Sequence, residues 1–118
     1  MSEYAEWLKE VFAEFGDISI RKMFGGHGVF YEGIMIGLVA WDVLYLKADE
    51  LNAPDFKALG LKPFMYDKGE KKVQMSYWQA PDETLDDPFA MKEWADSAYQ
   101  AALRSATKSK KAGKNKKK

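Results

Sequence analysis

One glycine-rich segment is the place in this sequence where backbone groups could gather around an anion. It reads Gly25, Gly26, His27, Gly28 and follows two cations, Arg21 and Lys22. Successive backbone N–H groups in such a segment can form a concave site for phosphate or carboxylate, which makes these six residues a candidate interaction or anion-binding loop. The segment lacks the Lys-Ser/Thr pair of a phosphate-binding loop and lies between two predicted strands. A tight turn or bulge that needs glycine is therefore the alternative interpretation.

His27 and Ser76 are the two side chains that could act in catalysis, and neither has the partner residues that catalysis needs. His27 is the only histidine, and no orienting acid or nucleophile is identified beside it, so we interpret it as a turn residue. Ser76 has no histidine partner. On a strand, Met75 and Tyr77 would share one face while Ser76 and Trp78 share the other, which is ordinary sheet packing. We predict no catalytic residue and expect a protein that is not an enzyme.

Metal and cofactor sites are also not predicted. The chain has no cysteine, which excludes thiolate zinc sites, iron–sulfur clusters and disulfides. A local group of acids (Asp82, Glu83, Asp86 and Asp87) is explained by helix capping and by the preference of carboxylates for helix N-termini. We therefore expect no metal ligand set and no cofactor.

The C-terminal segment carries the strongest charge pattern. Residues 108–118 hold seven of the eighteen basic residues and no acid, so residues 1–107 carry eleven cations against eighteen acids, about −7. The lysines are Lys108, Lys110, Lys111, Lys114, Lys116, Lys117 and Lys118. Such a tail binds nucleic acid through phosphate, without reading sequence and with strong salt dependence. A solubilising tail that folds back on the acidic body is the alternative.

Aromatic side chains crowd the predicted strands. They are Phe24, Phe30, Tyr31, Tyr45, Tyr66, Tyr77 and Trp78. Stacking platforms for nucleic-acid bases use such residues, but they are normally flanked by Lys and Arg, whereas this body is acidic. We therefore predict that they form the core and a protein-contact face, with a homodimer as one candidate assembly.

Composition and length set the class of protein. A chain of 118 residues, of which 47% are hydrophobic and 14% aromatic, predicts one folded domain over residues 1–106 and a disordered lysine-rich tail over residues 107–118. The N-terminus is acidic, unlike a secretory signal, and the longest apolar run, residues 34–41, is too short to cross a bilayer. We expect a cytoplasmic protein without membrane contact.

The periodicity of the apolar residues predicts the elements that position these side chains. Helical spacing predicts helices over residues 4–15, 53–59 and 88–104, and alternation with turn signals predicts strands near 18–24, 28–31, 35–40, 43–47, 63–66 and 72–78. Short turns between successive strands require antiparallel pairing. We predict an α+β fold with two layers, in which an antiparallel sheet of five to six strands packs against N- and C-terminal helices.

Several motifs in order resemble one family. Residues 21–30 resemble the R-x-M-F-G-G-x-G-φ-F signature of the TfoX/Sxy N-terminal domain, where φ is apolar. The order continues with residues 36–39 and 44–49, then 63–66, 75–78 with Pro81, and the pair Trp94-Ala95. The resemblance covers roughly residues 4–103.

The resemblance implies a role as well as a fold. Similar domains have two layers of helices and antiparallel sheet, and the named members regulate natural competence with the cyclic-AMP receptor protein at promoters. Those regulators carry a second C-terminal domain, whereas this chain has a lysine tail after its last helix, as a stand-alone short member would. We expect a non-enzymatic regulatory module that acts through protein contacts. The alternative is an accessory protein that binds DNA or RNA through its tail.

Overall fold

The computed structural model describes residues 3–23 and 26–116. Its helices are α1 (Glu3–Val11), α2 (Ala53–Ala58), α3 (Asp82–Asp86) and α4 (Pro88–Lys116). Its strands are β1 (Ser19–Met23), β2 (Gly26–Tyr31), β3 (Ile34–Ala40), β4 (Val43–Lys47), β5 (Pro63–Lys68) and β6 (Lys71–Gln79). This confirms the predicted α+β fold with a single antiparallel sheet.

The sheet has the order β1-β2-β3-β4-β6-β5, and every neighbouring pair is antiparallel. The first four strands form a meander because their turns are short. Glu32 and Gly33 have φ of 52° and 79°, and Trp41 and Asp42 have φ of 54° and 62°. Two successive positive φ angles match the right-handed twist of a two-residue hairpin. Strand β6 then pairs with β4, which places β5 at the edge.

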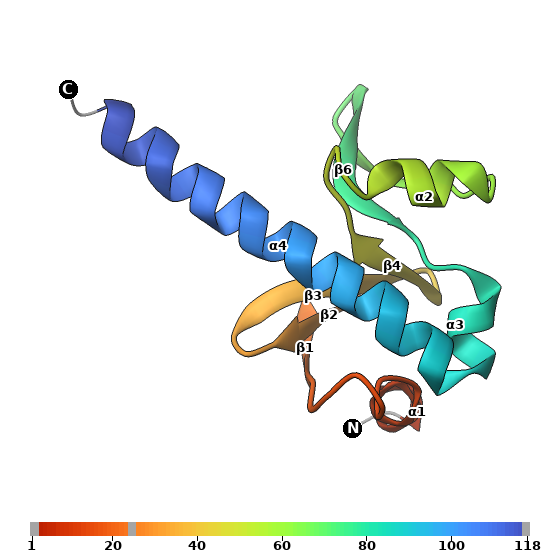
Figure 1. Cartoon of the computed structure of the whole chain (residues 1–118). Coiled ribbons are helices and arrows are strands. Elements are labelled where there is room, and N and C mark those ends of the chain that lie inside the picture. The colour runs from red at the N-terminus through yellow and green to blue at the C-terminus, as the bar shows by residue number, and fades with distance from the viewer. Residues whose placement is uncertain (1–2, 24–25, 117–118) are drawn as a thin grey trace.

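One face of the sheet carries the hydrophobic core. Helix α4 lies across β3 and β4, as Figure 1 shows, and its inward face has small side chains that let it approach the sheet closely. The fully buried residues include Ile36 and Leu46 of the sheet and Met91, Ala95 and Ala98 of the helix. Met91, Ala95, Ala98 and Ala102 form an inward stripe of this helix within the core cluster, and Trp94 packs against it.

Helix α4 is longer than the sequence predicted. It continues through Lys116, so most of the segment expected to be disordered is helical, while Lys117 and Lys118 lie outside the described residues. Figure 1 shows the C-terminal part of this helix extending away from the sheet. In the described part of the chain, no helix combines the length and apolar character needed to cross a membrane.

Candidate functional site

An apolar groove lies on the sheet face opposite α4. It has a volume of about 420 Å³, and the described residues that line it all belong to strands. The lining residues are Met23, Gly26, His27, Met35, Leu38, Val39, Ala40, Phe64, Tyr66, Met75 and Tyr77. We call this surface the groove face. Its volume falls in the range of ordinary ligand pockets, and its walls are nearly all apolar.

The two walls of the groove come from different parts of the sheet. One wall comes from β1, β2 and β3, and the other comes from the β5–β6 hairpin. The rings of Tyr45 in β4 and Phe64 in β5 meet with centroids 5.0 Å apart, although β6 lies between these strands in the sheet order. This contact connects the β5–β6 hairpin with the middle of the sheet.

Two glycines of β2 shape the first wall. A Cβ atom on Gly28 would lie 2.6 Å from Met23 Sδ and 2.9 Å from Phe30 Cε1, so glycine lets these side chains close together. A Cβ atom on Gly26 would overlap the carbonyl oxygen of Val39, so glycine here permits close approach of two backbones. The glycines predicted to bind an anion thus have a packing role.

The six residues predicted as an anion-binding loop do not form a loop where the structure describes them. Gly26, His27 and Gly28 lie within β2, opposite Met23, Lys22 and Arg21 of β1. Pairing along the strands holds these three residues extended, which differs from the predicted turn. Gly25 and the aromatic Phe24 fall outside the described residues. Binding of an anion by this set stays a prediction, but His27 is placed in the groove wall.

Tyr77 is the polar side chain most deeply embedded in the groove. It is only 9% exposed, and the Lys47 ammonium lies over its ring. Burial raises the pKa of its phenol above the ordinary value of 10.0. Tyr77 thus presents an apolar ring together with a hydroxyl that can donate a hydrogen bond to a bound molecule.

Two cations accompany the groove. The Arg21 guanidinium carbon lies 5.2 Å from the ring centroid of Phe30, beside Met23 and Met35. The Lys47 ammonium lies 5.1 Å from the ring centroid of Tyr77. None of the described groove-lining residues is acidic. The aromatic surface therefore has the flanking positive charge that the acidic composition of the body argued against.

The aromatic residues predicted to crowd the sheet divide between its faces. Tyr31 packs against Tyr99 of α4, with centroids 5.0 Å apart, and Trp78 lies in the core near Phe56. Tyr66 and Tyr77 line the groove. The predicted alternation of Met75 and Tyr77 against Trp78 is confirmed, because the first two face the groove and the third faces the core.

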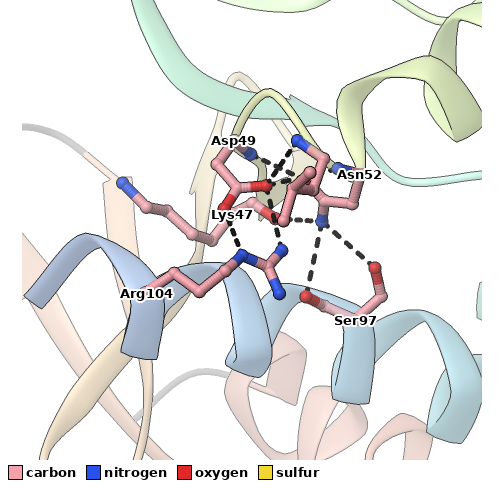
Figure 2. Close-up of polar contacts among 6 residues, drawn as sticks. Lys47, Asp49, Asn52, Ser97 and Arg104 are labelled. Atoms are coloured by element: carbon pink, nitrogen blue, oxygen red, sulfur yellow. Dashed lines mark hydrogen bonds and ion pairs between the residues drawn. The ribbon is translucent and has the colours of Figure 1, made fainter. Parts of the chain in front are cut away.

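A polar cluster lies near the groove, on the helix side of the sheet (Figure 2). Asp49 follows β4, and its carboxylate accepts hydrogen bonds from Arg104 Nε at 2.6 Å and Arg104 Nη2 at 3.0 Å. The buried Asn52 side chain donates to Lys47 O at 3.2 Å and Ser97 Oγ at 3.1 Å, and accepts from the Asp49 backbone N–H. These bonds fasten residues 47–52 to helix α4.

The charges of this cluster explain its pKa pattern. Hydrogen bonds from Arg104, and from the Asn52 and Leu51 backbone amides, lower the pKa of Asp49 to about 2 against opposing desolvation. The pKa of Arg104 is raised by the same contact. Because Asp49 already fills its acceptor positions, this arrangement indicates a structural clamp.

Lys47 also contacts the serine that was considered as a nucleophile. Its ammonium donates a hydrogen bond to Ser76 Oγ at 2.9 Å, and desolvation by burial lowers the Lys47 pKa. A serine–lysine pair needs N–H donors for the developing oxyanion. The nearby amides of Leu51 and Asn52 donate to Asp49 instead. The structure thus gives Ser76 an exposed hydrogen bond with Lys47.

The sequence did not predict that Lys47, Asp49 and Arg104 lie close together. Asp49 and Arg104 are 55 positions apart, and nothing in the local pattern of either residue points to the other. For the groove, the alternation in β6 did place Met75 and Tyr77 on one face. The pairing of β6 with β4, which brings the two walls together, had no local signal.

The positions of the imidazole and carboxylate side chains bear on metal binding. In residues 3–23 and 26–116, no three His, Asp or Glu side chains come together as a ligand set. The acids near α3 have other roles there: Asp87 Oδ1 accepts a hydrogen bond from the Phe89 amide, and Glu83 accepts one from the Trp94 indole.

Comparison with known protein families identifies a family to which the sequence is similar. The sequence profile of the TfoX N-terminal domain matches residues 10–102, which include all six strands and the part of α4 that packs on the sheet. No curated protein matches the sequence significantly.

Proposed function

Because this chain belongs to the TfoX N-terminal domain family, we propose that it is a non-enzymatic regulatory module that acts through protein contacts on the groove face. The observation that carries the proposal is the apolar groove, whose described lining residues all come from strands. Apolar surface left open beside polar residues is characteristic of protein-binding sites. By resemblance to competence regulators, the partner would belong to the transcription machinery, such as the cyclic-AMP receptor protein.

The chemistry of the site supports binding over turnover. The groove has two phenols among mainly apolar side chains, and the Asp49–Arg104 and Lys47–Ser76 pairs use their polar atoms on each other. A binding site gains affinity from apolar contact with a few placed polar groups, which is the composition found here.

Photo-crosslinking in the native cells tests the proposal. A photoreactive phenylalanine analogue would replace Tyr66, which is 47% exposed at the groove, and in a matched control it would replace Trp41, which is 88% exposed in the β3–β4 turn. We expect a defined protein adduct from position 66 and none from position 41. Equal adducts from both positions, or none from position 66, would contradict contact through the groove.

A second function follows from the charge of the C-terminal segment. The seven lysines of residues 108–118 and the projection of α4 away from the sheet favour non-specific binding of DNA or RNA (Figure 1). A salt-series titration of labelled DNA and RNA compares the full chain with a 1–107 truncation. We expect binding only by the full chain, with a steep decrease as salt rises. Binding by the truncation would move the contact to the body.

A further inference from the structure

Tyr77 supplies a hydrogen-bond donor within the groove. It is only 9% exposed and lines the groove, while no buried side-chain oxygen or nitrogen of the described residues lacks a hydrogen-bond partner. A molecule that fills the groove would exclude water from this hydroxyl, and a polar group that loses water without gaining a hydrogen bond costs free energy. The occupant should therefore present an oxygen acceptor within the apolar groove.

The walls indicate what surrounds that acceptor. Met23, Met35 and Met75 come from three different strands and border one groove together with Leu38 and the aromatic side chains. Methionine side chains are flexible and polarizable, and surfaces rich in them adapt to varied apolar side chains. A groove of about 420 Å³ accommodates one or two large apolar side chains of a peptide.

The charge beside the groove indicates that the bound segment of the partner is negatively charged. Arg21 and Lys47 lie against two aromatic rings of this face, and no acid is among the described residues that line the groove, although Asp49 offsets part of the Lys47 charge from beside the groove. This local positive charge contrasts with the net charge of about −7 on residues 1–107. Complementary charge across an interface favours the correct partner and penalises like charge.

The same charge disfavours two other occupants. In a two-fold dimer through this face, both copies would bring Arg21 and Lys47 to the interface, and neither would bring an acid among the described groove-lining residues. A nucleic-acid strand carries one charge per nucleotide and would be repelled by the acidic body over its length, whereas a short peptide carries few carboxylates. The methionine and aliphatic walls also differ from the open ring faces on which bases stack.

We propose that the groove binds an acidic peptide segment of a partner protein. A large apolar side chain enters the methionine-lined groove, an oxygen of the segment accepts a hydrogen bond from the Tyr77 hydroxyl, and flanking carboxylates pair with Arg21 and Lys47. This inference rests on the proposed function and specifies its partner.

Nuclear magnetic resonance titration of the full ¹⁵N-labelled chain tests the partner class with defined probes. The first peptide has a central Trp-Leu pair with two glutamates on each side. The second has two lysines on each side of the same pair, the third has two glutamates on each side of Ala-Ala, and a short oligo-dT is the fourth probe. We expect only the first peptide to shift amide resonances of β1, β3 and β6 at peptide concentrations up to the millimolar range.

Variants assign the binding to individual groups. Tyr77→Phe removes one hydroxyl and keeps the ring, and should lower the affinity for the first peptide by about 3- to 10-fold. Arg21→Gln should weaken it by about 2- to 5-fold and reduce its salt dependence. Lys72→Gln makes the same charge change at an exposed position of β6 next to the residues that face the groove, and should leave the affinity unchanged.

Each other outcome contradicts the inference. Equal binding of the lysine peptide would show that negative charge does not determine binding. Equal binding of the Ala-Ala peptide would show that a large apolar side chain is not needed. Shifts of groove resonances on addition of oligo-dT would assign the face to nucleic acid, and shifts on raising the protein concentration alone would assign it to a second copy. If no peptide binds while Tyr66 still crosslinks to a protein, the partner class is wrong and the proposed function stands.

Discussion

At the scale of single residues, the contact between Asp49 and Arg104 links the segment after β4 to helix α4. The two guanidinium–carboxylate hydrogen bonds are short and charged, and the Arg104 side chain is 39% exposed, so solvent screens part of their strength. Removing the guanidinium also leaves the Asp49 carboxylate without its main partner. The pair therefore contributes to stability more than an ordinary surface ion pair does.

We expect Arg104→Ala to lower the free energy of unfolding by about 1–2 kcal/mol. Urea unfolding with an unchanged m-value measures this effect. Lys92→Ala, an exposed lysine on the same helix, is the control and should change the stability by less than about 0.5 kcal/mol. An equal effect of both substitutions would argue against a specific contribution from the Asp49–Arg104 contact.

The pKa of Asp49 gives a pH dependence with a defined sign. Its folded-state pKa is about 2, below its ordinary value of 3.8, so the unfolded chain binds the proton more readily. The contribution of Asp49 is therefore fully present above about pH 4 and is lost as the pH falls toward 2. The stability of Arg104→Ala should depend less steeply on pH over this interval than that of the unsubstituted chain, as measured by urea unfolding at each pH.

At the scale of elements, β2 shows how the sheet constrains a glycine-rich segment. Local pattern predicts a turn at residues 25–28 because glycine is common in turns, but Gly26 and Gly28 are strand residues that allow close packing with β3 and β1. The requirement for glycine was recognised from the sequence, while its cause lies in tertiary contacts that a local pattern does not contain.

Two alanine substitutions in β2 should differ in cost. Gly26→Ala places a methyl group against the backbone oxygen of Val39, which cannot move alone, and we expect a loss of about 3 kcal/mol. Gly28→Ala meets the flexible Met23 side chain and should cost about 1–2 kcal/mol. Thermal and urea unfolding of both variants measure the order, and a larger loss for Gly28→Ala would contradict this packing.

At the scale of the whole molecule, the features that could be predicted from the sequence are those that depend on residues close together in the chain. The fold class, the six strands and the inward face of α4 follow from periodicity, and the Glu32-Gly33 turn follows from residue type. The insertion of β6 between β4 and β5 joins segments distant in sequence, so the groove could not be predicted as one site. The helical state of residues 107–116 was missed because their composition lacks an apolar stripe.

Truncation separates the folded body from the lysine-rich end. The core cluster ends at Ala102, and the last contact described above on α4 is made by Arg104. We expect a 1–107 chain to keep its midpoint of thermal unfolding within about 3 °C of the full chain. A large decrease in circular-dichroism melting temperature would show that the lysine segment supports the body.

The strand order determines where the sheet can separate into two parts. Strands β1–β4 form one unit of neighbouring hairpins and β5–β6 form another, and they join along a seam of three residue pairs between β4 and β6. Hairpins form rapidly because their contacts are local, whereas the seam closes over a longer span of chain. The walls of the groove belong to different units, so opening the seam also separates the groove. A molecule bound to both walls would therefore slow hydrogen exchange at the seam, at amides that it does not touch.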